Sequence, residues 1–266
     1  TKKEREPMKD PFEHHELKHL SASQINEYIA SPAKWLLRVS GYRDNSGGPP
    51  MWRGIAVDQA ISYGLENPDL SEEEVVDYAL GIYKERHSEG LKTSSFDEVK
   101  VQKEKESLSG YLAAAMPHYR SLGPPIESQS KIVIEIEDVP VPIVGYIDLL
   151  YEGVVRDIKT VSRLPSRVPS YTCRQLAIYA NATNSIPIVD YVHCTKTSQQ
   201  LVVMPVPDHA SHWKMVVKTA KNMTKLLSIS SDIQEIAGLL MPDFDDWRWS
   251  SGEKDAARRL WRLNDE

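Results

Sequence analysis

The sequence predicts one compact α/β or α+β unit whose first half is largely helical. The chain has 266 residues, of which 41% are hydrophobic, enough to bury one sizeable core. Apolar residues recur at helical spacing through the first half of the chain. A strand-like alternation of apolar residues begins at Lys131, and strand and helix patterns follow it toward the C-terminus.

The first half contains several predicted helices. Ser21 or Ser23 is a candidate N-cap for the first of them. This helix extends to about Arg38 and is split or restarted at Pro32, because proline removes a backbone donor. Further helices are expected over 51–64, 71–87 and 98–121.

The second half begins with a predicted strand, since Ile132, Ile134 and Ile136 occupy every second position. Two further strands are expected over 144–150 and 154–160, followed by a helix over 171–183. A second strand pair over 188–196 and 201–206 and a long amphipathic helix over 209–227 come next. The tail from Pro242 is rich in tryptophan. We expect its tryptophans to pack against the body of the protein, with stacking on bases as the alternative: Trp247, Trp249 and Trp261.

Residues 1–20 carry mixed charges and histidines, and a flexible N-terminal segment is predicted there. His15 and His19 are four residues apart, but no further ligand follows at usable spacing, so a solvated terminus is favoured over a metal site. No secretory signal and no bilayer-length apolar run is recognisable, which predicts an intracellular protein. Cys173 and Cys194 form no CxxC pair and are expected to be buried apolar residues.

The distribution of charge along the sequence limits the kinds of molecule that the protein can bind. A net charge of -6 and a pI near 5.8 argue against a protein that coats nucleic acid nonspecifically, because such binding depends on displacing counterions with lysine and arginine. Between residues 156 and 174, however, Asp157 is the only acid among a group of basic residues. A polyanionic substrate is therefore compatible with the sequence. The basic residues are Arg156, Lys159, Arg163, Arg167 and Arg174.

A tight turn at 152–153 (Glu-Gly) predicts a hairpin between the second and third strands. If these two residues form the whole loop, Tyr151 pairs with Val154. Counting outward then places Asp148 directly opposite Asp157 on the same face of the hairpin. Directly opposed residues have Cβ atoms about 4.5 to 5.5 Å apart, so two carboxylates would be forced together.

Two carboxylates at this distance repel each other, and one would take up a proton unless a cation lay beside them. Lys159 is two residues beyond Asp157, so strand alternation turns it to the same face. Hard oxygen ligands suit Mg²⁺ or Mn²⁺, and such a site suits phosphodiester hydrolysis. The alternative is a solvated strand with a weak ion pair, since a lone D-x-K tripeptide occurs by chance in most proteins of this length.

Two segments, GYIDLLYEGVVRDIKT and RQLAIYA, contain a G-x-x-D strand, a D-x-K strand and a Q-x-x-x-Y helix in that order. This order resembles the core of RecB-type PD-(D/E)XK nucleases. The resemblance implies that Asp148 and Asp157 hold metal and that Lys159 acts on the attacking water. It assigns to Gln175 and Tyr179, four residues apart on one helix face, the positioning of Lys159 or a phosphate. Gly145 completes the matching set.

The resemblance extends upstream, where SASQINEYIASPAKWLLR and WRGIAVDQAI are similar to the family's first two helices. Asp58 stands where the family has a histidine ligand, and a carboxylate there favours Mg²⁺ over softer metals. Relatives with an iron-sulfur cluster have a cysteine before the first-helix proline and others near the C-terminus. Here Ser31 takes the first position and no cysteine follows Met241, so no iron-sulfur cluster is expected.

The fold implied by the resemblance is a restriction-endonuclease-like core, a mixed central β-sheet flanked by helices, with a helical N-terminal half. Residues 21–266 would form a single nuclease domain. Its expected parts are a helical part over 21–125, a catalytic sheet core over 126–210 and C-terminal helices over 211–266.

The implied activity is a Mg²⁺- or Mn²⁺-dependent deoxyribonuclease, expected to be an exonuclease or end-processing enzyme of recombination, repair or phage replication. DNA, as ends or single strands, and a recombination or replication protein are the expected partners, with no membrane, in the cytoplasm of a bacterium or a phage-infected cell. Two alternatives stay open: a noncatalytic DNA-binding or assembly module, and a different metal hydrolase or structural protein with solvated hairpin charges. Candidate contacts to the DNA backbone are Arg53, Arg163, Arg167 and Arg174.

Overall fold

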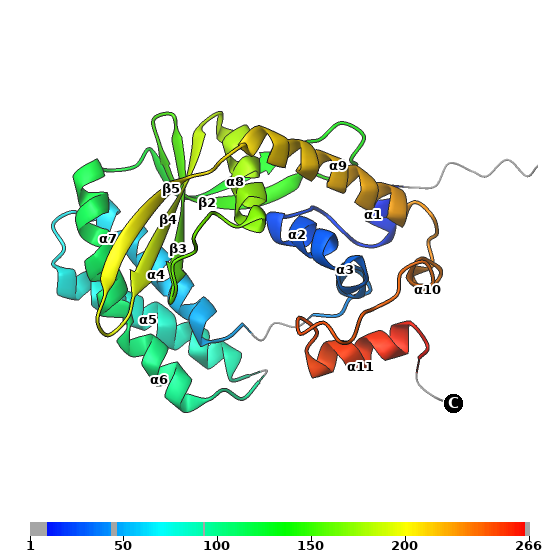
Figure 1. The fold of residues 1–266 in the computed structure, drawn as a ribbon, viewed down its shortest axis with the longest axis horizontal. Coiled ribbons are helices and arrows are strands. Elements are labelled where there is room, and N and C mark those ends of the chain that lie inside the picture. Colours follow the sequence, from blue (N-terminus) through cyan, green and yellow to red (C-terminus); the bar gives the residue numbers. More distant parts are fainter. Residues whose placement is uncertain (1–9, 44–46, 93, 264–266) are drawn as a thin grey trace, which may run out of the picture. The chain divides into compact units, whose positions relative to one another are not determined.

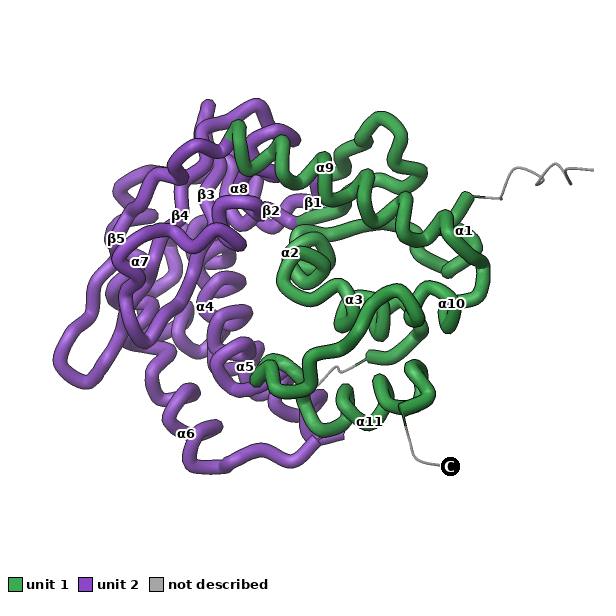
Figure 2. The backbone as a smooth tube through the Cα atoms, turned by 45° about the vertical axis from the view of Figure 1, so that its right-hand side comes forward, with its two compact units in different colours: residues 1–44, 133–145, 210–266 green, residues 45–132, 146–209 purple. Residues whose placement is uncertain are grey.

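The computed structural model describes residues 10–43, 47–92 and 94–263. Their internal contacts divide the chain into two compact units (Figure 2). Unit 1 comprises residues 1–44, 133–145 and 210–266, and unit 2 comprises residues 45–132 and 146–209. Unit 1 thus combines segments from both ends of the chain with a short middle segment, and unit 2 contains the two segments between them.

A five-stranded sheet in the described part of the chain has the strand order β1-β2-β3-β4-β5 (Figure 1). Most of it belongs to unit 2. Strand β3 pairs antiparallel with β2 and parallel with β4, and β4 pairs antiparallel with β5. The sheet is therefore mixed, as the resemblance implied. The strands are β1 (Glu127–Ile134), β2 (Ile143–Tyr151), β3 (Val154–Val161), β4 (Ile186–Cys194) and β5 (Gln199–Pro205).

One face of the sheet in unit 2 is covered by helices from the first half of the chain (Figure 1). Leu149, Ile158 and Val192, from three neighbouring strands, share one apolar core with residues of these helices. Alternation along each strand places these three side chains on the same face. The helices are α4 (Pro49–Glu66), α5 (Glu72–Gly90), α6 (Glu98–Glu106) and α7 (Leu108–Leu122).

Helix α8 (Ser170–Thr183) connects β3 to β4 and contacts both strands. Two parallel neighbours need such a crossover, because the chain must return to the same end of the sheet before the second strand starts. The helix ends where Asn184 adopts a left-handed conformation, which asparagine tolerates better than most residues. Asp157, which points away from Ile158, is hydrogen-bonded to Gln175 of α8. The crossover therefore covers the face opposite α4 to α7.

Unit 1 contains helices from both ends of the chain. Ser21 and Ser31 cap α2 and α3, each accepting a hydrogen bond from the backbone N–H of the third helical residue. Lys34 of α3 and Glu253 of α11 form an ion pair of 2.9 Å beside the apolar cluster that joins these two helices. The helices are α1 (Pro11–His14), α2 (Ala22–Ala30), α3 (Pro32–Val39), α9 (His209–Leu227), α10 (Ile233–Ala237) and α11 (Ser251–Leu260).

The predicted elements are present with somewhat different bounds, and the contacts explain two of the differences. The helix expected over 98–121 is divided into α6 and α7 at Ser107, whose hydroxyl donates 2.7 Å to the backbone carbonyl of Glu104. The first strand ends before Ile136, although the apolar alternation continues to that residue. The carbonyl of Ile136 accepts a turn hydrogen bond of 3.0 Å from Val139, so the chain has already left the sheet.

The predicted flexible segment, 1–20, is described only from residue 10, and residues 1–9 lie outside the described residues. Within the described portion, Phe12 and Leu20 are fully buried. The backbone N–H of Leu20 donates 2.9 Å to the carbonyl of Pro142. Part of residues 10–20 is therefore packed within unit 1, and the flexibility of the segment stays a prediction.

The tail tryptophans divide between core and surface. Trp249 is buried in the cluster of α3 and α11, as expected, whereas Trp247 is 89% exposed. Trp261 packs partly against the same cluster and donates its indole N–H to the carbonyl of Leu240. Among the described residues, no helix is both long enough and apolar enough to cross a membrane.

A buried ion pair on the helix-covered face offers a test of the packing. Arg156 of β3 lies 2.8 Å from Asp190 of β4, whose side chain is fully buried and also accepts 2.9 Å from the hydroxyl of Tyr119. We expect Asp190→Ala to lower the free energy of unfolding by about 3 to 5 kcal/mol, because it leaves a buried guanidinium unpaired. Urea denaturation measures this loss.

The matched control removes an exposed ion pair. Asp138 lies 3.0 Å from Lys221, and its side chain is 77% exposed. We expect Asp138→Ala to change the free energy of unfolding by less than about 1 kcal/mol. Equal effects of the two substitutions would contradict the assignment of the Arg156 and Asp190 pair to the core.

Candidate active site

All six residues that the sequence assigned to catalysis or metal binding lie in unit 2. Asp157 and Lys159 are two residues apart on β3, so both side chains point to the face that α8 covers. Hydrogen bonds and electrostatic contacts connect the whole set. Its members are Asp58 on α4, Asp148 on β2, Asp157 and Lys159 on β3, and Gln175 and Tyr179 on α8.

The turn between β2 and β3 has the predicted length and register. Tyr151 pairs with Val154 across it, and Gly153 adopts a φ of 67°, which glycine reaches without a Cβ clash. Pairing ends one position before the predicted pair of Asp148 and Asp157. The two acids are therefore in register, but the backbone ladder does not extend to them.

Asp148 contacts β3 through its side chain at this position. Its Oδ2 atom accepts a hydrogen bond of 2.6 Å from the backbone N–H of Ile158. This bond holds the carboxylate against β3, next to Asp157. Burial raises the pKa of Asp148 well above its usual value, and the charges of Asp58 and Asp157 raise it further. The carboxylates are thus close enough to influence one another's ionisation.

Asp157 is the centre of the hydrogen-bonded cluster and is 1% exposed. Its two carboxylate oxygens lie 2.9 and 2.8 Å from Nζ of Lys159. The side-chain amide of Gln175 donates 3.1 Å to Oδ1 of Asp157 and 2.9 Å to the hydroxyl of Tyr179. The i, i+4 spacing on α8 places both side chains on one helix face, as the sequence predicted, and Gln175 connects this face to Asp157.

Asp58 reaches the cluster from α4, a helix that contacts β3. Burial raises the pKa of Asp58 to about 7, and the charge of Asp157 adds to this, whereas a hydrogen bond from Gln129 and the charge of Lys159 oppose it. A carboxyl with this pKa is partly protonated at neutral pH. A bound cation would favour its ionised form.

The ammonium of Lys159 stays charged at neutral pH. Its burial alone would lower the pKa, but the neighbouring carboxylates of Asp157 and Asp148 outweigh burial and raise it. Burial raises the pKa of Asp157, against the opposing effect of Lys159. Lys159 therefore acts as a fixed positive charge and hydrogen-bond donor, and it cannot accept a proton from water.

The donor set fits a hard divalent cation. Oδ1 of Asp58 and Oδ2 of Asp157 are buried without a hydrogen-bond partner, which is costly unless a positive charge meets them. Oδ2 of Asp157 does contact Lys159 as an ion pair. No three acidic, histidine or cysteine side chains in the described ranges are already arranged as a complete ligand set. Binding a cation would therefore require these carboxylates to rotate toward one another.

Comparison with known families gives the site a context. The sequence profile of the PD-(D/E)XK nuclease superfamily matches residues 19–243, most of the chain. The chain belongs to this superfamily. Asp157 and Lys159 are separated by one residue, the spacing that the (D/E)XK of the superfamily's name describes. Nucleases of the superfamily generally use divalent metal ions such as Mg²⁺, in agreement with the oxygen ligands in this cluster.

Other comparisons are less specific. A solved structure titled "Crystal structure of SSO0001" is 16% identical, with 78% of this chain and 84% of that chain covered and a TM-score of 0.29. A likeness at this level has no bearing on activity. No curated protein shows a significant match to the chain.

The four arginines predicted to contact DNA fall into two groups. Arg53 is 5% exposed: it is paired with Glu104 and donates 3.2 Å to the carbonyl of Thr160. Arg174 is 9% exposed, and burial lowers its pKa. These two guanidinium groups are held inside unit 2, which corrects the prediction that they face a polyanion. Only Arg163 and Arg167 are exposed, in the loop that follows β3.

Gln129 is a site neighbour that the sequence did not indicate. It hydrogen-bonds to Asp58, and its amide also donates 3.4 Å to the hydroxyl of Ser62. Its φ of 48° departs from the extended backbone of β1, at a cost of about 1 to 3 kcal/mol. A glutamine in a strand has no distinguishing pattern, because the feature that identifies it is a contact with a residue far away in sequence.

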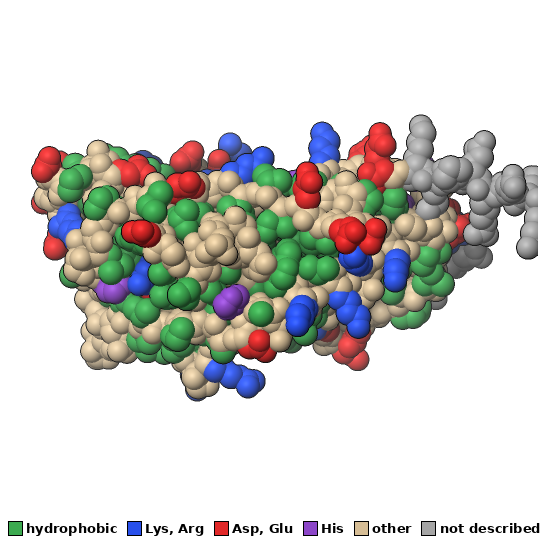
Figure 3. Space-filling view, turned by 90° about the horizontal axis from the view of Figure 1, so that it is seen from above, with side chains coloured by type: hydrophobic (Ala, Val, Ile, Leu, Met, Phe, Trp, Pro, Cys, Tyr) green, Lys and Arg blue, Asp and Glu red, His purple; other side chains and the backbone are tan. Residues whose placement is uncertain are grey.

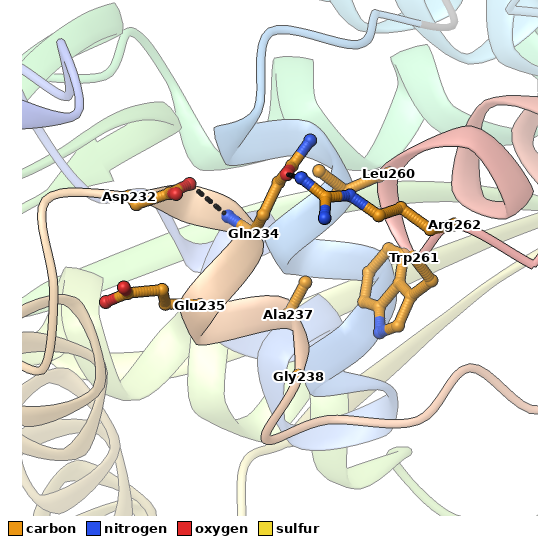
Figure 4. Close-up of a pocket in the computed structure, with 8 residues that line it drawn as sticks. All are labelled: Asp232, Gln234, Glu235, Ala237, Gly238, Leu260, Trp261 and Arg262. Atoms are coloured by element: carbon orange, nitrogen blue, oxygen red, sulfur yellow. Dashed lines mark hydrogen bonds between the residues drawn. The ribbon is translucent and has the colours of Figure 1, made fainter.

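Unit 1 contains a pocket of about 350 Å³ whose acidic residues, unlike those of the cluster in unit 2, are bonded to their neighbours in the chain (Figure 4). Asp232 accepts 2.8 Å from the backbone of Gln234, and Glu235 accepts 2.6 Å from Ser230. Arg262 donates to the side chain of Gln234. Both acids of this pocket are thus engaged in local hydrogen bonds, and it offers no cluster comparable with that of unit 2.

The raised pKa of Asp58 predicts how stability depends on pH without metal. Folding raises this pKa from 3.8 to about 7, so the folded state binds more protons than the unfolded state in that interval. The free energy of unfolding should therefore fall as the pH rises from about 4 to about 7, by at most about 1.4 kcal/mol per pH unit from this group. Urea denaturation at a series of pH values, in the presence of a chelator, measures this fall in the free energy of unfolding.

Two variants separate Asp58 from other titrating groups. Asp58→Asn should flatten the fall in stability and exceed the wild type in stability above about pH 7. Asp77→Asn, which removes an exposed aspartate of α5, should follow the wild-type curve. A wild-type curve that rises over this interval, or one unchanged by Asp58→Asn, would contradict the raised pKa of the buried Asp58.

Proposed function

We propose that the chain is a Mg²⁺- or Mn²⁺-dependent deoxyribonuclease that acts from DNA ends, as an exonuclease or end-processing enzyme. The observation that carries the proposal is the buried cluster around Asp157. Asp58 and Asp148 lie beside it, Lys159 forms its ion pair, and Oδ1 of Asp58 is buried without a hydrogen-bond partner. Membership of the superfamily supplies the reaction class, hydrolysis of phosphodiester bonds.

Asp58, Asp148 and Asp157 are the residues that would hold the metal. All three offer oxygen, the ligand that Mg²⁺ and Mn²⁺ prefer. When bound, the ion would lower the pKa of a coordinated water and neutralise phosphate charge. The carboxylates themselves would fix the place of the ion and, through the 2.6 Å bond from Ile158 to Asp148, tie that place to the backbone of β3.

Lys159 would orient the attacking water and stabilise the negative charge that develops on the phosphate. Its position next to Asp157 and its raised pKa support this role, because a permanently charged donor needs no proton transfer to act. Gln175 would hold the carboxylate of Asp157, and Tyr179 would hold Gln175. Both would thereby position Lys159 rather than react.

DNA is the proposed substrate, with Arg163 and Arg167 as candidate contacts to its backbone. Both are exposed in the loop directly after β3, within a few residues of Lys159. The preference for ends comes from the resemblance of the 145–179 segment to RecB-type nucleases, a group that serves recombination, repair and phage replication. Those processes are accordingly the proposed setting.

Removal of the lysine tests the proposed activity. We expect Lys159→Ala to lower the cleavage rate by about 100- to 1000-fold, because the charge next to the phosphate is lost. Labelled single-stranded, blunt double-stranded and circular DNA, each with Mg²⁺ or Mn²⁺, are the substrates. End-dependent action predicts cleavage of linear DNA with circular DNA left intact.

The matched control is Lys131→Ala, which removes an exposed strand lysine outside the cluster and should leave cleavage unchanged. Equal activity of wild type and Lys159→Ala would overturn the role of this lysine. Absence of cleavage by the wild type with both metals would favour the noncatalytic DNA-binding module instead.

Gln129 provides a test in which metal binding is measured instead of nuclease activity. A residue that orients a metal-binding carboxylate usually affects metal affinity about 10- to 100-fold. We expect Gln129→Ala to weaken Mn²⁺ binding by about tenfold, measured by calorimetric titration of the protein without DNA. Gln102→Ala, which removes a glutamine bonded to Glu106 on the surface of α6, is the control. A folded Gln129→Ala protein with wild-type Mn²⁺ affinity would contradict the role of Gln129 in orienting a metal-binding carboxylate.

A further inference from the structure

Helix α9 carries all of its charge in one stripe. Its residues, His209–Leu227, include four lysines and no acid. At about 100° per residue, the spacings of four, three and four place the lysine side chains within about 60° of one another around the helix. We call them the lysine stripe: Lys214, Lys218, Lys221 and Lys225.

The stripe faces solvent. Lys214, Lys218 and Lys225 are exposed, and the side chain of Lys221 is 34% exposed. Within the described parts of the chain, Lys221 is the one member with an ion-pair partner, Asp138 at 3.0 Å. Because Asp138 is itself 77% exposed, solvent screens this pair. The face of the molecule seen in Figure 3 carries basic side chains interspersed with acidic and hydrophobic ones.

The opposite side of α9 is occupied by the protein core. Val216, Met223 and Leu227 are fully buried, and they lie about half a turn away from the stripe. A basic amphipathic helix that binds membranes needs its apolar face free to enter the lipid. Here that face is already buried, so the stripe offers charge alone. A polyanion in water fits it better than a bilayer.

The length of the stripe matches a run of phosphates. From Lys214 to Lys225 the helix rises by about 16 Å, at 1.5 Å per residue. Along the axis of a B-DNA duplex, each strand carries a phosphate about every 3.4 Å, so the stripe is as long as about five base-pair steps measured along that axis. Four positive charges in a row are also a local exception in a chain whose net charge is -6. The sign and spacing both complement a nucleic-acid backbone.

We propose that the lysine stripe of α9 is a DNA-binding surface that contacts the phosphate backbone independently of base sequence. It is a second contact, built from other residues than the nuclease site of unit 2. The identity of the polymer as DNA rests on the proposed function. The recognition itself rests on the charge, exposure and spacing of the lysines. Such a surface would retain the substrate between successive cleavage events.

The test compares DNA binding with and without the stripe. The stripe variant carries Lys214→Gln, Lys218→Gln and Lys225→Gln. The control variant carries Lys100→Gln, Lys103→Gln and Lys105→Gln on α6, which removes the same number of exposed charges from a helix of mixed sign. Binding of a labelled DNA duplex is measured by fluorescence anisotropy across a salt series, with a chelator present so that no cleavage occurs.

We expect the stripe variant to bind on the order of tenfold more weakly at low salt. The slope of log affinity against log salt should become shallower by about 2 to 3, since each lost phosphate contact releases about 0.9 counterion fewer. The control variant should keep the wild-type slope. Replacing the same three stripe lysines by arginine should restore binding, because the charges are kept.

Three results would overturn the inference. They are an unchanged slope in the stripe variant, an equal change in the α6 control, and loss of binding to anionic phospholipid vesicles with DNA binding intact. Thermal unfolding followed by circular dichroism should give all variants the wild-type midpoint. Because binding is measured without metal, the effect would persist even in a chain shown to lack nuclease activity, so the two proposals fail separately.

Discussion

The two-residue turn at 152–153 fixes which side chains of β2 and β3 share a face. With Tyr151 opposite Val154, Leu149 and Ile158 enter the core beneath α4 to α7, whereas Asp157 points to α8. A slip of one residue would exchange the two sets, burying acids among apolar side chains and exposing the core residues. The apolar core and the acidic cluster are therefore two consequences of one register.

The cluster also depends on contacts between elements that are distant in sequence. The parallel pairing of β3 and β4 requires a crossover, and α8 as that crossover places Gln175 over Asp157. Asp58 arrives from a helix about a hundred residues upstream of Asp157, and Gln129 holds it from β1. Each of these contacts fixes a carboxylate from one side, so the acids keep their places despite mutual repulsion.

The sequence predicted what local spacing determines. The turn length set the register of Asp148 and Asp157, and the i, i+4 pair on α8 followed from helical periodicity. The burial of Arg53 could not be predicted, because its partner Glu104 lies on another helix. Gln129 was missed for the same reason. Residue type and spacing identify a face of an element, but burial and partner depend on the tertiary packing.

The two faces of β3 show how the cluster differs from ordinary buried charge. On the side covered by α4 to α7, one base, Arg156, pairs with one acid, Asp190, and the hydroxyl of Tyr119 donates a further hydrogen bond to that acid. On the other side, three carboxylates share one ammonium, that of Lys159. Folding could have neutralised these acids with another internal cation, as it did across the sheet. Because it did not, the excess negative charge must be met by protons or by a cation from solution, and a divalent ion fits an excess of two charges.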